Sequence, residues 1–363
     1  MSTTEEKALK ILSILNDNQH EAYIVGGYVR DKLLNKKSND IDICTSATPK
    51  EIMEIFPNTS SPNYGSINII YKNTNFDITT FRKEIKYQDN RLPVKIKYIK
   101  NLKKDLLRRD FTINTICLDK DQNIIDLLNA TPDLEHKRIK TVGNPRYRLK
   151  EDSLRILRAI RFATILDFEI EVKTKHYLKE YAYLLKKLSF SRKKQELDKI
   201  FTSPNKAKGI QLLLELKLDD SLKLTNLKDI IACDDLIGIW AQLNVDDIYP
   251  FTKSEKQQMR SIRELLQKDI HDPYNLYTYG LYISTVAYQI KQENISNLNK
   301  LYQELPIHSP KEININGQEI ANTLQKKPGP YLKEITMDLE KQILSNNIPN
   351  QKEALQQYIC QNY

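Results

Sequence analysis

The sequence has few cysteines, few glycines and no long apolar run. No stretch of about 18 apolar residues occurs in its 363 residues, so no membrane-spanning helix is predicted. The four cysteines (Cys44, Cys117, Cys233 and Cys360) are widely spaced and form no CxxC pair, which argues against a zinc site or a disulfide framework. This usage predicts reduced thiols in a cytoplasmic protein. The segment Met1–Lys10 also lacks the apolar core of a secretion signal.

Composition and charge indicate a folded protein with a polyanionic partner. The hydrophobic fraction is 40% and the charged fraction 28%, and at roughly 150 residues per domain the length predicts two or three compact units. Residues 141–208 contain 17 Lys or Arg and 8 Asp or Glu, so this segment alone accounts for the chain's net charge of +9. Such a segment favours nucleic acid as a partner, and solvated helices rich in lysine are the ordinary alternative.

Apolar periodicity divides the chain into a mixed α/β first part and a helical remainder. Residues 1–20 are predicted to form an amphipathic helix, and short apolar runs predict a small sheet within residues 1–140. The expected strands are Ala22–Val25, Ile41–Cys44, Ile67–Tyr71 and Phe76–Phe81, and the segments Val94–Ile99 and Phe111–Leu118 continue the mixed pattern. After Gly143 we expect helices only, including one from Glu151 to Leu166. The predicted fold class is therefore multidomain α+β.

A glycine pair and two carboxylates follow the first expected strand closely. Adjacent glycines, Gly26 and Gly27, let backbone N–H groups approach a phosphate, because no Cβ intervenes. Arg30 follows three residues later and is placed to reach the same phosphates. Asp40 and Asp42 are two apart on an expected strand, so their carboxylates share a face.

Two carboxylates on one face repel each other unless a cation lies between them. Oxygen ligands favour Mg²⁺, and a pair of metal ions about 3.5–4 Å apart stabilises an in-line phosphoryl displacement. Asp77, on the expected strand Phe76–Phe81, is placed to supply a third carboxylate. We therefore predict that Asp40 and Asp42 hold Mg²⁺ for phosphoryl transfer. A DxD motif that stands alone is also common on solvated strand edges.

The order and spacing of several motifs resemble one protein family. The segments that carry the resemblance are GGYVRDKLL (26–34), NDIDICTSATP (39–49), RRDFTIN (108–114), EDSLRILR (151–158) and NGQEI (316–320). They resemble the nucleotidyltransferase superfamily, and within it the class II tRNA nucleotidyltransferases and bacterial poly(A) polymerases, most of all the Gram-positive-type CCA-adding enzymes. The resemblance implies a mixed-sheet nucleotidyltransferase head of the polymerase β type, followed by an all-α neck, body and tail.

The resemblance also implies boundaries and partners. The implied parts are a catalytic head (1–140), a helical neck that reads the base (141–208), a helical body (209–305) and a helical tail that binds tRNA (306–363). The implied substrates are ATP, CTP and the 3′ end of tRNA, whose acceptor and TΨC arms are gripped through phosphate contacts and shape. The sequence predicts no membrane partner, and it does not define an oligomeric state.

Asp152 and Arg155 are the expected base-reading residues. They lie three apart on an expected helix and therefore share a face. A carboxylate accepts a hydrogen bond and a guanidinium donates one, which matches the amino donor and ring-nitrogen acceptor of both cytosine and adenine. Guanine and uracil present the reverse pattern. We therefore predict selection of CTP and ATP without a nucleic-acid template. An intrahelical ion pair is the alternative.

The remaining motif residues have implied roles at the phosphates. The resemblance places Arg109 on the nucleotide phosphates, and Asp110 and Asn114 are expected to fix loops by hydrogen bonds. Arg158 and Arg161 extend the face of Arg155, and are expected either to bind the triphosphate or to support the pocket.

The segment Lys83–Val94 resembles the flexible head loop that full CCA-adding enzymes carry and CC-adding relatives lack. Tyr87, Asp89 and Arg91 stand in family-like positions, whereas Leu92 stands where the family has a second arginine. We therefore predict a template-independent enzyme that adds C, C and A to tRNA by a two-metal mechanism with release of pyrophosphate.

Several alternatives stay open at this point. Within the family they are a CC-adding or A-adding relative, and a poly(A) polymerase, which usually carries a longer or more basic C-terminal extension. A non-enzymatic RNA-binding module would keep the basic segment but has no use for Asp40 and Asp42 beside the glycines. A metal phosphohydrolase is suggested by His271–Asp272, but the other histidines lack metal-ligand spacing, so this pair is better read as a turn.

Overall fold

The computed structural model describes residues 3–57, 59–88 and 92–363. The chain forms two compact units, Met1–Thr225 and Asn226–Tyr363. The described part of the first unit contains every strand, and the second unit is helical. The predicted fold class, a mixed-sheet head followed by helices, is confirmed. The finer division into head, neck, body and tail stays a prediction.

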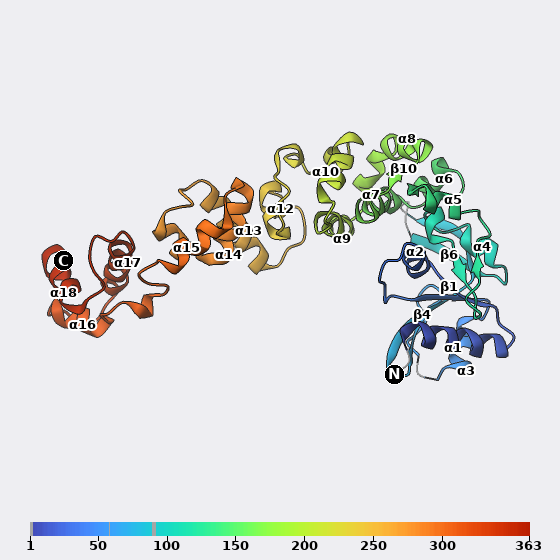
Figure 1. Cartoon of the computed structure of the whole chain (residues 1–363), viewed down its shortest axis with the longest axis horizontal. Helices are drawn as coiled ribbons and strands as arrows, with labels where there is room; N and C mark the ends of the chain where they lie inside the picture. Colours follow the sequence, from blue (N-terminus) through green and yellow to red (C-terminus); the bar gives the residue numbers. More distant parts are fainter. Residues whose placement is uncertain (1–2, 58, 89–91) are drawn as a thin grey trace. The chain divides into compact units, whose positions relative to one another are not determined.

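A six-stranded sheet lies at the centre of the head (Figure 1), in the order β3-β4-β2-β1-β7-β8. Strands β2 and β4 are parallel, and every other neighbouring pair is antiparallel. The strands are β1 (Ala22–Val25), β2 (Asp42–Thr45), β3 (Ser66–Tyr71), β4 (Thr74–Thr80), β7 (Cys117–Leu118) and β8 (Ile124–Ile125). Alternate residues of β3 and β4, such as Ile67 and Ile78, are buried, as expected for a sheet with one face on the core.

Helix α1 (Thr4–Asp17) packs against β1, and its predicted apolar stripe of Ala8, Ile11, Leu12 and Leu15 is fully buried. A capping box between Thr3 and Glu6 begins this helix. The other elements before residue 152 are α2 (Gly27–Leu33), α3 (Pro49–Ile55), the antiparallel hairpin β5 (Arg82–Gln88) and β6 (Leu92–Tyr98), α4 (Leu102–Leu106), the 3₁₀ turn η1 (Thr112–Asn114), α5 (Thr131–Glu135), β9 (Arg138–Ile139) and α6 (Pro145–Glu151).

Two predictions differ from the structure. The predicted helix Glu151–Leu166 is interrupted: α6 ends at Glu151, and α7 spans Leu154–Leu166. Asp152 between them is extended (φ −138°, ψ 101°), and its Oδ1 accepts the N–H of Leu154 at 3.0 Å. An aspartate bonded to the backbone in this way favours a helix end over a helix interior.

The segment Phe111–Leu118, expected to continue the mixed pattern, contains the buried turn η1 followed by β7. Oδ1 of Asp110 accepts the N–H of Phe111, and the hydroxyl of Thr115 donates to the carbonyl of Thr112. The expectation of no strand after Gly143 is also wrong. The short strand β10 (Glu169–Ile170) pairs in parallel with β9.

Helix α7 is the central helix of the segment that follows the sheet. Ten of its 13 residues are buried, and it packs against α9 and α10. A Cβ at Gly209 of α10 would lie 2.4 Å from Ile200 and 2.7 Å from Thr164, so glycine permits this close approach. The elements of this segment are α8 (Val172–Glu180), η2 (Ala182–Lys187), α9 (Phe190–Phe201), α10 (Lys206–Glu215) and α11 (Asp219–Leu222). The packing against α9 and α10 therefore fixes the backbone from which the side chains of α7 extend.

The second unit contains helices that pack around their own apolar core. Its single tryptophan, Trp240, is fully buried, with its ring centroid 4.9 Å from that of Tyr249 and 5.3 Å from that of Phe251. The elements are η3 (Leu227–Asp229), α12 (Leu236–Leu243), α13 (Lys253–Leu266), α14 (Pro273–Lys291), α15 (Ile295–Gln303), η4 (Pro310–Glu312), α16 (Gly317–Thr323), α17 (Tyr331–Leu344) and α18 (Lys352–Asn362). Across the described residues of both units, no helix is long and apolar enough to cross a membrane.

Candidate active site

Three aspartates meet at one edge of the sheet. Asp42 is the first residue of β2, and its register partners are Val25 at the end of β1 and Asp77 on β4. Asp40 precedes the strand. The pKa of Asp42 is raised, first because the surrounding chain displaces water from its carboxylate and then because Asp40 and Asp77 carry like charges, while Arg109 lowers it. The predicted carboxylates therefore lie close enough to repel one another, and Asp77 joins them through strand register.

The glycine turn lies beside this carboxylate edge. Gly26 has φ +88° and ψ −134°, a left-handed conformation that favours glycine. A Cβ at this position would lie 3.5 Å from Nη1 of Arg109 and 3.6 Å from Oδ2 of Asp42. Gly27 begins α2, whose first N–H groups have no partner within the helix. The structure thus brings together the turn, the aspartates and Arg109.

Arg109 is held in place by a buried carboxylate that was not predicted from the sequence. Asp105 on α4 is fully buried, and its Oδ2 lies 3.7 Å from Nη2 of Arg109. Its Oδ1 accepts Nε of Arg108 at 2.8 Å and the backbone N–H of Arg82 at 3.0 Å. This contact could have been inferred from the spacing, because Asp105 precedes Arg108 by three residues and Arg109 by four on a helical segment.

Asp110 is the centre of a buried hydrogen-bond network. Its Oδ1 accepts the N–H of Phe111 at 2.8 Å and Nδ2 of Asn114 at 3.1 Å, and its Oδ2 accepts Nε of Arg158 at 2.8 Å. Oδ1 of Asn114 accepts Nη1 of Arg30 at 2.7 Å. Burial would raise the pKa of Asp110, but the Arg158 charge and these hydrogen bonds hold it far below its usual value. The prediction that Asp110 and Asn114 fix loops by hydrogen bonds is confirmed.

Three arginines surround the ring of Phe162, a residue that was not predicted. The guanidinium carbons of Arg30, Arg158 and Arg161 lie 5.3, 5.4 and 4.4 Å from the ring centroid. Arg161 also forms a buried ion pair with Glu196, with Nη1 and Oε2 2.9 Å apart. Of the two roles expected for Arg161, this contact favours support of the pocket. Phe162 was detectable as the aromatic residue four positions after Arg158.

Arg155 does not share a helical face with Asp152, because α7 begins only after Asp152. Its guanidinium is buried and donates to the carbonyl of Arg148 at 2.8 Å and to that of Arg108 at 3.0 Å. Arg148 in turn donates to the carbonyls of Arg108 and Arg109, the latter at 2.9 Å. The base-reading candidates are therefore tied to the backbone that carries Arg109.

The flexible-loop residues fall at the end of the β5–β6 hairpin. Asp89 and Arg91 lie outside the described residues, and of Tyr87 only the backbone, within β5, is described. Their predicted role stays a prediction.

The carboxylate edge suits a metal ion that is completed by substrate. In the described ranges 3–57, 59–88 and 92–363, no three His, Cys, Asp or Glu side chains form a ready-made metal site. Mg²⁺ is commonly bound by one or two carboxylates together with substrate phosphates and water, so Asp40 and Asp42 fit that donor set. One oxygen of Asp77 already accepts Nδ2 of Asn68 at 3.1 Å.

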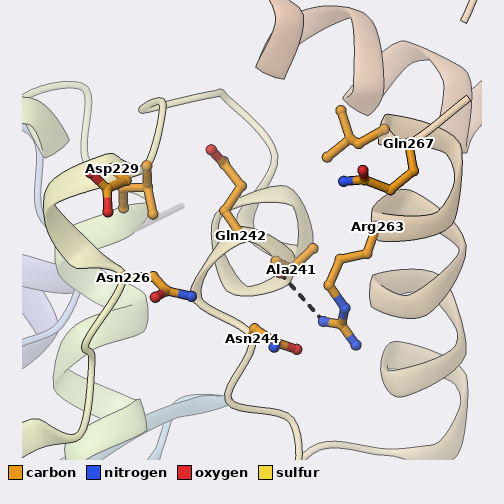
Figure 2. A pocket seen from close by; sticks show the side chains of 9 residues that line it. Asn226, Asp229, Ala241, Gln242, Asn244, Arg263 and Gln267 are labelled. Carbon is orange, nitrogen blue, oxygen red and sulfur yellow. Dashed lines mark hydrogen bonds between the residues drawn. The ribbon is translucent and has the colours of Figure 1, made fainter. Parts of the chain in front are cut away.

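A separate pocket of about 430 Å³ lies within the second unit (Figure 2). Side chains labelled around it are Asn226, Asp229, Gln242, Asn244, Arg263 and Gln267. Arg263 donates to the carbonyl of Ala241 at 3.3 Å and to Asp246 at 3.1 Å, so its charge is already neutralised. None of the predicted site residues lines this pocket.

A mixed sheet with paired aspartates beside a glycine turn, followed by a helix that supplies arginines, defines a nucleotidyltransferase. Family descriptions agree: the poly A polymerase head domain matches residues 22–140, the probable RNA- and SrmB-binding site of polymerase A matches residues 167–223, and the putative tRNA nucleotidyltransferase domain 2 matches residues 249–359. The CCA-adding enzyme of Bacillus cytotoxicus is 32% identical over 387 residues, covering 98% of each chain. The chain therefore belongs to the tRNA nucleotidyltransferase and poly(A) polymerase family, on the branch of the Gram-positive-type CCA-adding enzymes, and it is a tRNA nucleotidyltransferase.

Solved structures agree over the full length. The Bacillus stearothermophilus CCA-adding enzyme in complex with CTP has a TM-score of 0.86 at 26% identity, covering 99% of this chain and 98% of that one. The Thermotoga maritima CCA-adding enzyme complexed with tRNA has a TM-score of 0.73 at 22% identity, covering 99% and 95%. At that identity the second comparison supports the fold alone.

Proposed function

We propose that this protein adds C, C and A, from CTP and ATP, to the 3′ end of tRNA without a nucleic-acid template. The observation that carries the proposal is the convergence of Asp42, Asp77, Gly26 and Arg109 at one sheet edge. Nucleotidyl transfer needs carboxylates for metal and donors for the triphosphate in one place, and this edge offers both. The match of residues 249–359 to a tRNA nucleotidyltransferase domain supports tRNA as the acceptor.

The phosphate donors come from two elements that the protein holds rigidly. Arg109, fixed by Asp105, faces the turn at Gly26, where N–H groups at the start of α2 are available to phosphate oxygens. Arg30, on α2 after this turn, is oriented by Asn114, and Arg158 is oriented by Asp110. The two arginines add positive potential where the triphosphate carries negative charge.

Asp40 and Asp42 would hold divalent metal, for which we propose Mg²⁺, with Asp77 beside them as a third carboxylate. When bound there, a pair of such ions supplies activation of the RNA 3′ hydroxyl and charge stabilisation for the departing pyrophosphate. The protein's own contribution is to keep three like-charged groups together. After the loss of water from its carboxylate, the like charges of Asp40 and Asp77 raise the pKa of Asp42, and this repulsion favours a cation between the three groups.

Base selection is proposed for Asp152 and Arg155. Asp152→Asn keeps an oxygen for the N–H of Leu154, which Oδ1 accepts in the native protein, but replaces the second acceptor with a donor. We expect this variant to lose about 10- to 100-fold of its preference for CTP over UTP, because one base contact becomes a mismatch of about 1–3 kcal/mol. The measurement is kcat/KM for each nucleotide. An unchanged ratio would remove Asp152 from base reading.

We further propose that the tRNA acceptor and TΨC arms lie on the basic and helical segments, and that Lys83–Val94 acts as the flexible loop needed for the final A. A CC-adding enzyme is the second candidate, because Leu92 departs from the loop pattern.

One experiment tests the proposed function directly. Purified protein is incubated with tRNAs that end before, within and after CCA, together with CTP and ATP, and the products are read at single-nucleotide resolution. We expect C, C and A to be added in order, with one pyrophosphate released per nucleotide. Products that stop after CC would identify a CC-adding enzyme, and binding without any extension would identify an RNA-binding module.

A further inference from the structure

A pocket of about 700 Å³ lies in the first unit at the foot of the β5–β6 hairpin. It is lined from the hairpin by Lys83 and Lys97, from α4 by Lys104, from the residues after α4 by Arg108, and from α6 by Arg148. Two glutamates, Glu84 and Glu151, also line it. The positively charged lining residues therefore outnumber the negatively charged ones.

The arginines and the lysines of this pocket differ in their partners. Arg108 forms ion pairs with Asp105 (2.8 Å) and Glu84 (3.7 Å), and Arg148 pairs with Glu151. The side chains of Lys83, Lys97 and Lys104 are exposed, and the structure describes no hydrogen bond or ion pair that links any of them to another described residue. Their three charges face the pocket without an acidic partner in the described part of the chain.

Strand register makes this arrangement unfavourable in the absence of a ligand. Lys83 and Lys97 are direct cross-strand partners in the hairpin. Like charges placed directly opposite each other destabilise a hairpin, and Lys104 adds a third positive charge from α4. An anion in the pocket would relieve this repulsion.

This pocket and the proposed triphosphate site are each lined by one of two consecutive arginines. Arg109 faces Gly26 and Asp42, whereas Arg108 lines the pocket. The pocket also reaches Glu151, immediately before the proposed base-reading residue Asp152. Addition of a nucleotide to RNA requires two polyanions to meet, and the triphosphate has its own donors at Arg109 and the glycine turn.

We propose that Lys83, Lys97 and Lys104 form a binding site for phosphodiesters of the single-stranded 3′ end of the tRNA. This inference rests on the proposed function and names the surface that positions the second substrate. The site takes RNA backbone phosphate and carries no base selectivity, because an ammonium group contacts phosphate as a point charge.

The test is the triple variant Lys83→Ala, Lys97→Ala, Lys104→Ala. We expect its KM for tRNA lacking CCA to rise about tenfold or more at low salt, with the KM for CTP within about twofold of wild type, because phosphate contacts govern affinity for the nucleic acid. The slope of log KM for tRNA against log salt should fall by about 2, since each single-strand phosphate contact contributes about 0.7. Replacing all three lysines with arginine should retain the wild-type KM.

Lys103→Ala is the matched control, because Lys103 is an exposed lysine on the same helix α4 that does not line the pocket. It should leave both KM values unchanged.

A triple variant with unchanged KM for tRNA overturns the proposed site, and so does a variant in which only the KM for CTP rises. Failure of the wild-type protein to extend tRNA overturns the proposed function instead, and the pocket is then tested by direct binding of tRNA. If the triple variant melts early, single substitutions, expected to raise the KM for tRNA about two- to threefold, replace it.

Discussion

Replacement of Asp42 by alanine is expected to lower the rate of CMP incorporation into tRNA by about three orders of magnitude, as expected when a group that stabilises developing charge is lost. Asp42 is exposed at the start of β2, so the fold does not depend on burial of its side chain. Its pKa is raised by Asp40 and Asp77 as well as by loss of water, so its removal also relieves repulsion. The melting temperature should therefore not fall. The measurements are single-turnover incorporation of labelled CMP and tRNA binding by fluorescence anisotropy.

The controls for this result separate metal binding from net charge. Asp40→Ala should show a loss similar to that of Asp42→Ala. Asp77→Ala should lose less, because Asn68 already occupies one of the Asp77 oxygens. Asp121→Ala, which removes an exposed carboxylate in a turn of the same unit, should leave incorporation unchanged. Near-normal turnover by Asp40→Ala or Asp42→Ala would show that these carboxylates do not hold the metal.

The carboxylate edge could be predicted from the sequence because its signals are local. Gly26 and Gly27 directly follow a strand, and Asp42 begins the next one. Asp77 was harder to place, since only strand pairing shows that it lies beside Asp42. Its position on a strand was predicted, whereas the parallel register of β4 and β2 was not, and its role as a third carboxylate stays a prediction.

The interior of the site could not be predicted from periodicity. The interruption at Asp152 depends on one carboxylate capping the N–H of Leu154, a local choice that helical spacing does not reveal. The partners of Arg155 and Arg161 are more distant. Arg155 binds the carbonyl of Arg108, 47 residues away, and Arg161 pairs with Glu196, 35 residues away. Pairings at such separations are set by tertiary packing rather than by a sequence pattern.

Replacement of Asp110 by asparagine is expected to destabilise the first unit by about 3 kcal/mol at pH 7, because it leaves the Arg158 guanidinium without its buried counter-charge. The network also orients Asn114 and, through it, Arg30. The KM for CTP should therefore rise as well, by about 30-fold if each of the two misoriented arginines costs near 1 kcal/mol. Asp167→Asn is the control, because Asp167 is an exposed partner of Lys208 and should change stability by less than about 1 kcal/mol.

The pKa of Asp110 determines how this difference in stability changes with pH. The folded-state pKa of Asp110 lies below its unfolded value, so the ionised carboxylate stabilises the fold at all pH values above the unfolded value of about 4. The stabilisation is lost as the pH falls from there toward the folded-state pKa. The difference between wild type and Asp110→Asn should thus be constant from pH 8 to about pH 5 and shrink below about pH 4. Urea unfolding followed by circular dichroism measures it, with the fluorescence of Trp240 as an internal reference, because this tryptophan lies in the second unit. A difference that stays constant down to pH 3 would show that the ionised Asp110–Arg158 contact does not stabilise the fold.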